Sequence, residues 1–172
     1  FMFGANATFS FGGSFSVNPG IEFHSGTSQK DAPAGESNSF NPLYGTAHKF
    51  NGHMDYFFAG NHFNTVGLQD IFLKGLYKQN KFSAGIDFHL FSAPADILDP
   101  ADNTQTLSSN LGQEADLYIG YKLSPEVTFS MGYSQYFTTA SLIALKGGSN
   151  DETSNWAWAS VIFKPVFLNT GK

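Results

Sequence analysis

Polar and apolar residues alternate along several segments of this chain, and the charged residues of each segment share one side of it. In residues 82–91, Asp87 and His89 alternate with an apolar set: Phe82, Ala84, Ile86, Phe88 and Leu90. Successive side chains of a β-strand point to opposite faces of the sheet. The pattern therefore predicts strands that have one apolar face and one charged face.

The same alternation recurs along the chain and predicts about eight strands. We expect them at residues 3–11, 20–24, 48–58, 66–76, 82–91, 114–123, 127–137 and 155–167. Either Gly12-Gly13 or residues 17–20 supply the first turn, and Gln79-Asn80 supply a later one.

The predicted connections alternate in length. Short ones lie near residues 12–20, 78–81 and 124–126, and long ones near 25–47, 59–65, 93–112 and 138–153. Outer-membrane barrels have short periplasmic turns and long extracellular loops. A soluble meander has no physical reason to alternate in this way.

These patterns predict an all-β fold, a transmembrane antiparallel β-barrel with lipid outside and water inside. We expect residues 1–172 to form one such barrel region. A soluble β-sandwich would also show alternation, with its phenylalanine face inward and its charges in water. We disfavour it because the apolar face is rich in Phe in every strand and no strand resembles a charged, protected edge.

The predicted faces give two sets of candidate residues. The charged, water-facing set that would line a lumen is Glu22, Lys49, Asp55, Asp70, Lys74, Asp87, His89, Glu114, Asp116, Lys122 and Lys164. Aromatic residues near strand ends would form girdles at the two membrane interfaces; the main candidates are Tyr77, Tyr133, Phe137, Trp156 and Trp158.

Composition narrows the function classes. The net charge of −5 gives no electrostatic reason to bind nucleic acid, and without cysteine there is neither a disulfide framework nor a thiolate metal site. No apolar run reaches the length of a membrane helix. All nine basic residues are lysine, which excludes bidentate guanidinium contacts.

Candidate chemistry is weak. His48 and His53 would lie on opposite faces of a strand, which is poor metal spacing, and the five histidines more simply hydrogen-bond to neighbouring groups. Oxygen ligands near one long loop are possible for Ca²⁺, but their spacing matches no calcium loop: Asp96, Asp99, Asp102 and Glu114. No pattern brings Ser, His and Asp together. We therefore expect no enzyme activity, no metal and no cofactor.

Three stretches resemble a known family. Residues 40–57 (FNPLYGTAHKFNGHMDYF), 66–70 (VGLQD) and 155–167 (NWAWASVIFKPVF) resemble the C-terminal part of the alginate-export outer-membrane barrels, especially their porin-like Bacteroidetes branch. The resemblance implies a larger barrel of about 18 strands, of which this chain would supply the C-terminal portion. The strand-like start at Phe1 also leads us to expect residues before it.

These expectations combine into a porin-like channel of the Gram-negative outer membrane that passes small polar solutes or saccharides. Its partners would be membrane lipid and lipopolysaccharide, with a homo-oligomer or other outer-membrane proteins as further possibilities. The family name implies export of an anionic polysaccharide, but the predicted water-facing set holds six acids against four lysines. A third alternative is a non-conducting eight-stranded barrel with a structural or partner-binding role.

Overall fold

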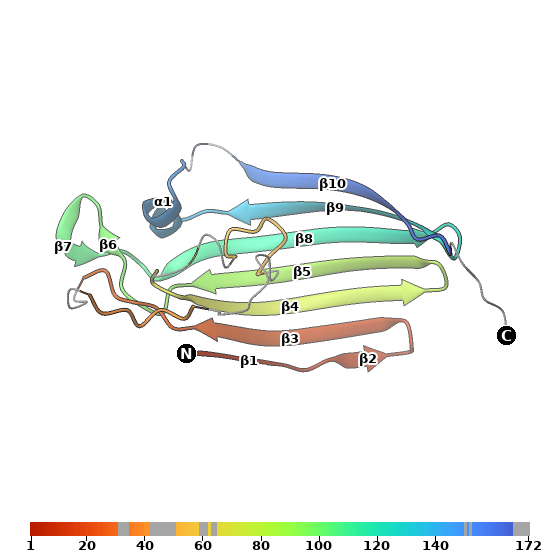
Figure 1. Ribbon diagram of the computed structural model, residues 1–172, viewed down its shortest axis with the longest axis horizontal. Helices are drawn as coiled ribbons and strands as arrows, with labels where there is room; N and C mark the ends of the chain where they lie inside the picture. The colour runs from red at the N-terminus through yellow and green to blue at the C-terminus, as the bar shows by residue number, and fades with distance from the viewer. Residues whose placement is uncertain are drawn as a thin grey trace.

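A computed structural model describes residues 1–30, 35–41, 51–58, 62, 65–149, 151 and 153–166. They form one antiparallel eight-stranded sheet in the order β1-β3-β4-β5-β8-β9-β10, with β2 also paired to β3 (Figure 1). The sheet is open, with β1 and β10 as its edges. The all-β fold class is therefore confirmed. Among the described residues, no helix is both long enough and apolar enough to span a bilayer.

Apart from the predicted third strand, the strands of the sheet follow the predicted alternation. The strands of the sheet are β1 (Met2–Asn6), β2 (Phe9–Phe11), β3 (Phe15–His24), β4 (Leu68–Gln79), β5 (Phe82–Ser92), β8 (Asn110–Lys122), β9 (Val127–Phe137) and β10 (Ser154–Phe163). The connections hold a small hairpin of β6 (Leu98–Asp99) and β7 (Asp102–Thr106) and the helix α1 (Ala140–Lys146).

The predicted third strand is wrong. Residues 51–58 form bends and turns and no strand, and residues 48–50 lie outside the described part of the chain. Asp55 and Gly52 both adopt positive φ, 62° and 80°, which a strand does not allow. Among the described residues no strand lies between β3 and β4, and β3 pairs directly with β4.

Without that strand, every short turn lies at one end of the sheet and every long connection at the other (Figure 1). Gly12 and Gly13 take positive φ in the turn between β2 and β3, and Asn80 does so between β4 and β5. These turns set the strand registers. We call the two ends of the sheet the turn end and the loop end.

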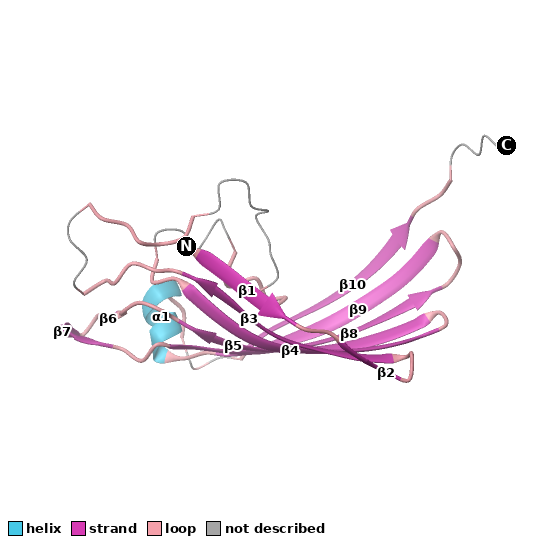
Figure 2. Cartoon of the chain, turned by 90° about the horizontal axis from the view of Figure 1, so that it is seen from below, coloured by secondary structure: helices cyan, strands magenta, loops and turns pink. Residues whose placement is uncertain are grey.

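The sheet is curved, and its two faces differ (Figure 2). On the convex face, apolar side chains stand exposed across the middle of neighbouring strands: Leu73 is 53% exposed, and Ile86 and Leu117 are each 52% exposed. Ile86 and Leu117 are direct cross-strand partners, so this surface continues from strand to strand. Residues 51–58, from the connection between β3 and β4, lie over the other, concave face.

The buried core lies at the loop end of the concave face, where loops cover the sheet. Its main members are Phe57, Val66, Leu68, Phe91, Ile97, Leu111, Tyr136 and Leu142. Helix α1 contributes Leu142 and is capped by Thr139, whose hydroxyl accepts from the Leu142 amide. Gly147 ends the helix at positive φ.

The predicted girdle divides into two groups. Tyr77 and Phe137 lie on the convex face at opposite ends of their strands, while Tyr133 lies on that face in the middle of β9. Trp156 and Trp158 were wrongly assigned: their cross-strand partners are Ser134 and Gly132, on the concave face. Convex aromatics missing from the prediction surround Tyr77 at the turn end; they are Phe15, Phe82 and Tyr121.

Candidate functional site on the concave face

Strand pairing aligns four polar residues in one row across the concave face. Lys74, Asp87, Asp116 and Ser134 are successive cross-strand partners on β4, β5, β8 and β9. The Lys74 ammonium lies 3.8 Å from an Asp87 carboxylate oxygen, and the Ser134 hydroxyl donates to Asp116. We call this the charged row. Its members reach one another only because the sheet register puts them side by side.

A second pair lies nearer the loop end and joins two successive rows of the concave face. His89 Nδ1 is 2.9 Å from each oxygen of Asp70, and both side chains are almost completely buried. Asp70 also accepts a hydrogen bond of 3.1 Å from the Asn51 side-chain amide. The hydrogen bonds from these two donors offset much of the hydration free energy that the carboxylate loses on burial.

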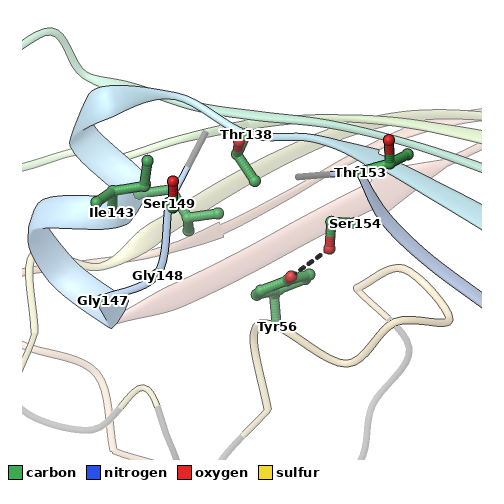
Figure 3. A pocket seen from close by; sticks show the side chains of 9 residues that line it. Tyr56, Thr138, Ile143, Gly147, Gly148, Ser149, Thr153 and Ser154 are labelled. Carbon is green, nitrogen blue, oxygen red and sulfur yellow. Dashed lines mark hydrogen bonds between the residues drawn. The ribbon is translucent and has the colours of Figure 1, made fainter. Parts of the chain in front are cut away.

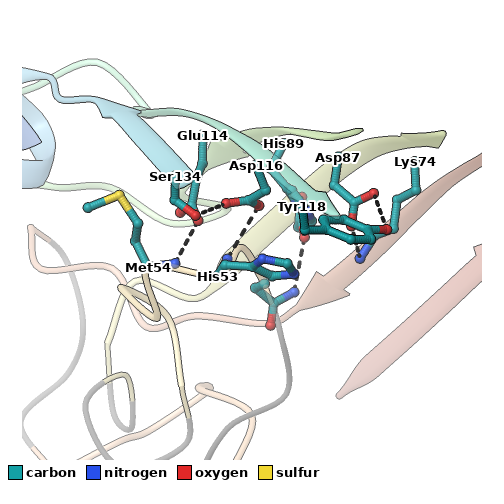
Figure 4. Close-up of polar contacts among 11 residues, drawn as sticks. His53, Met54, Lys74, Asp87, His89, Glu114, Asp116, Tyr118 and Ser134 are labelled. Atoms are coloured by element: carbon teal, nitrogen blue, oxygen red, sulfur yellow. Dashed lines mark hydrogen bonds and ion pairs between the residues drawn. The ribbon is translucent and has the colours of Figure 1, made fainter. Parts of the chain in front are cut away.

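Residues 51–58 lie against these carboxylates, and we call them the inserted segment (Figure 4). The Met54 amide donates to Glu114 Oε1 at 2.7 Å, and the His53 amide donates to Asp116 at 3.4 Å. Gly52 is so close to Glu114 that a Cβ there would collide with the carboxylate. Consecutive amides of a turn thus bind the acids of β8, as amide nests bind other anions.

Aromatic packing holds the other end of the inserted segment. Phe57 packs against Phe91 with ring centroids 4.7 Å apart, and Tyr56 packs against Tyr136 at 4.5 Å. The Tyr56 hydroxyl also hydrogen-bonds to Ser154 at 2.6 Å. The inserted segment therefore joins the middle strands to the edge strand β10.

Tyr56 and Ser154 also line a cavity of about 200 Å³ between the C-terminal end of α1 and the start of β10 (Figure 3). Its walls combine five hydroxyl-bearing residues with the apolar Leu142 and Ile143 and with Gly147 and Gly148. No charged side chain lines it among the described residues. The cavity is therefore an uncharged hollow of mixed polar and apolar lining at the loop end.

Two partly buried titratable groups lie at the loop end, His62 in a connection and Lys146 in the last turn of α1. Burial lowers the pKa of His62 to about 4, so the ring is neutral at pH 7, and its Nε2 donates to the Gly67 carbonyl at 2.9 Å. Burial also lowers the pKa of Lys146 to about 8; its ammonium lies 5.7 Å from the centre of the Phe57 ring. At the loop end, burial therefore favours the uncharged form of both side chains.

The predicted charged residues fall into three groups. Asp70, Lys74, Asp87, His89, Glu114 and Asp116 come together on the concave face, with Glu22 beside Asp70 in the register. Lys122 and Lys164 are exposed at the turn end, away from this cluster. Asp55 lies in the inserted segment and not on a strand, and Lys49 lies outside the described residues.

Sequence reasoning missed the amides of the inserted segment, Ser134 as a partner of Asp116, and the face of the sheet on which the tryptophans of β10 lie. The last could have been found. In the predicted strand 155–167 the apolar Val161 and Phe163 are odd-numbered, so the even-numbered Trp156 and Trp158 belong to the opposite face by strand parity. Within the described ranges, no three His, Asp or Glu side chains converge as a metal site requires.

Comparison with known proteins adds no assignment: the sequence matches no family model and no curated protein. The class of site is thus defined by its geometry alone. It is a row of paired charges and neighbouring buried acids on one face of a curved antiparallel sheet, partly covered by a segment of the chain itself.

Proposed function

We propose that this chain forms part of the wall of a bacterial outer-membrane β-barrel, a porin-like channel for small polar solutes or saccharides. The observation that carries the proposal is the contrast between the faces: apolar side chains exposed across the convex face, charges gathered on the concave face. Monomeric soluble proteins rarely expose a continuous apolar surface, whereas a barrel wall must expose one to lipid.

The strand lengths support a membrane location. The six strands from β3 to β10 in the main sheet contain 10 to 13 residues each. A tilted strand of about 9–11 residues crosses the hydrocarbon layer. The grouping of Phe15, Tyr77, Phe82 and Tyr121 on the convex face at the turn end fits an interfacial girdle.

In this proposal the concave face lines a water-filled lumen and the inserted segment narrows it. Most of the charges on that face are already paired, so they stiffen the wall and fix the segment. Because acids outnumber cations in the cluster, the resulting field favours cations and neutral solutes over anions. The edges β1 and β10 would pair with further strands of a larger barrel.

The resemblance to the alginate-export family remains part of the proposal, as a relation of architecture. Export of an anionic polysaccharide fits less well, because a polyuronate would meet Asp87 and Asp116 in the charged row. A non-conducting barrel is the second candidate. The observation that favours it is the inserted segment itself, which covers part of the concave face.

Conductance of the purified protein in a planar bilayer, under a salt gradient, tests the proposal. We expect stable single-channel steps with a weak preference for cations. Substituting Asp87→Asn together with Lys74→Met removes one pair of the charged row and should shift ion selectivity while leaving the steps stable. Absence of any conductance in a correctly inserted protein would favour the non-conducting barrel. Strong anion preference would favour the exporter.

A further inference from the structure

Two aromatic rings lie flat on the concave face in a single row. Tyr118 of β8 and Trp158 of β10 belong to the cross-strand row next to the charged row, on its turn-end side. Each ring covers a glycine of the preceding strand: Tyr118 lies over Gly85, and Trp158 over Gly132. A Cβ at Gly132 would lie 2.7 Å from the Trp158 indole. The glycines thus allow both rings to lie against the sheet.

Trp156 extends this aromatic surface. Its ring centroid lies 6.3 Å from that of Trp158, with 34° between the planes, and the residue is 46% exposed. These are the only two tryptophans among the 172 residues. We call Tyr118, Trp156 and Trp158 the aromatic track.

Covering a glycine is a known way for an aromatic residue to stabilise a sheet, and it accounts for the position of each ring. It does not account for Trp156, which covers no glycine and stands half-exposed beside polar neighbours. A large apolar surface in such a place costs free energy unless a ligand covers it.

Polar groups flank the aromatic track on both sides. The charged row lies on the loop-end side of Tyr118 and Trp158 and continues into Trp156, the cross-strand partner of Ser134. The Tyr118 hydroxyl donates to Asp87 at 3.3 Å. On the turn-end side the next row begins with Lys78 on β4 and continues with small residues, which leave space above the sheet: Ser83, Gly120, Ser130 and Ser160. Flat apolar rings between rows of hydrogen-bonding groups suit a ligand with apolar C–H faces and a polar hydroxyl rim.

We propose that the aromatic track binds neutral oligosaccharides of pyranose sugars, by stacking of sugar rings on Trp156 and Trp158. The inference rests on the proposed channel function and specifies its solute. The electron-rich ring faces attract the slightly positive C–H groups of a pyranose, and the half-buried serines of the next row, Ser83, Ser130 and Ser160, offer hydrogen bonds to its hydroxyls. Uronate oligomers are disfavoured because their carboxylates would approach Asp87 and Asp116.

Binding is tested by titrating the purified, detergent-solubilised protein with maltohexaose, cellohexaose and hexamannuronate, followed by tryptophan emission and calorimetry. We expect at least one neutral sugar to change the emission saturably and hexamannuronate not to. Trp156→Leu should weaken neutral-sugar binding about tenfold. Trp158→Phe, which keeps a ring over Gly132, should retain most of the affinity. The matched control Tyr133→Leu removes an aromatic from the convex face and should leave affinity unchanged.

The outcomes separate this inference from the proposed channel. Sugar-dependent block of single-channel current, weakened in the Trp156→Leu variant, supports both. Conductance without binding of either neutral sugar would contradict sugar binding by the aromatic track but not the proposed channel. Tighter binding of hexamannuronate than of either neutral sugar also overturns it. Saturable neutral-sugar binding without conductance supports the track as a binding site and overturns the channel.

Discussion

The two faces of this sheet are made from the same strands, but one gathers charged side chains and the other apolar ones. On the concave face nearly every charged group has a partner: Lys74 with Asp87, His89 with Asp70, Asp116 with Ser134. On the convex face, side chains such as Ile86 and Leu117 stand in the open. A soluble protein buries the apolar groups and exposes the charges. In the proposed barrel wall, this reversed arrangement has a physical reason, because water would contact the concave side and hydrocarbon the convex side.

Breaking the buried pair on the concave face should have the largest effect. Asp70→Leu leaves His89 buried without its carboxylate partner, and we expect a loss of about 3–5 kcal/mol of folding free energy. The double variant Asp70→Leu/His89→Leu should recover a large part of that loss, because no unpaired polar ring remains. Urea unfolding in detergent measures both. Equal destabilisation by the single and double variants would contradict the pairing.

Introducing charge on the convex face sharpens the comparison. Ile86→Lys should cost about 2–4 kcal/mol, because Ile86 lies in the middle of its strand and so at the bilayer midplane of the proposed barrel. Lysine at Ser83 or Ser130, on the concave face, should be tolerated because that side chain reaches water. Folding into lipid vesicles, read by the gel shift of folded against heated protein, compares the variants. The same tolerance at both faces would refute the face assignment.

Acid should loosen the loop end without affecting the strands. The folded-state pKa of His62 is lowered to about 4 against 6.5 when unfolded, so the neutral ring stabilises the fold at neutral pH. This contribution, on the order of 3 kcal/mol, is lost as pH falls through 6.5 toward 4. Proteolysis of the loops across that range should accelerate in the native protein. His62→Gln, which keeps a donor for Gly67, should show a flatter pH dependence.

A methyl group on the inserted segment should have a smaller, local effect. Gly52→Ala forces a side chain into positive φ and against the Glu114 carboxylate, so the segment should detach from β8 at a cost of about 1–3 kcal/mol. In the channel we expect a larger conductance. Gly35→Ala, also at positive φ but with open space around it, is the control for backbone strain alone. Unchanged conductance in Gly52→Ala would show that the segment does not narrow the lumen.

Much of the sheet could be predicted from the sequence, because alternation is a local property that each strand carries by itself. The predicted bounds of β9 coincide with those observed, and Gly12-Gly13 and Asn80 marked their turns. The strand predicted at residues 48–58 was wrong because Met54 and Tyr56 happen to be spaced as in a strand, although Asn51 and Gly52 indicate a turn. The predicted connections offered a second warning, since two long ones followed in succession around that segment.

The site was less predictable for a physical reason. The amides of His53 and Met54 bind carboxylates about 60 residues further along the chain. No local pattern carries such a contact. Helix α1 was missed as well, although its Thr139 cap and terminal Gly147 are both visible in the sequence. A helix of 7 residues inside a long loop gives too short a periodic signal.

The most direct test of the reversed faces uses the absence of cysteine from this sequence. Single cysteines placed in turn at residues 117 to 121 of β8 would be labelled in lipid vesicles with a charged, water-soluble thiol reagent and with a lipid-soluble one. We predict that positions 118 and 120 react with the water-soluble reagent and that 117, 119 and 121 react only with the lipid-soluble one. Equal labelling of all five positions by the water-soluble reagent would contradict the account.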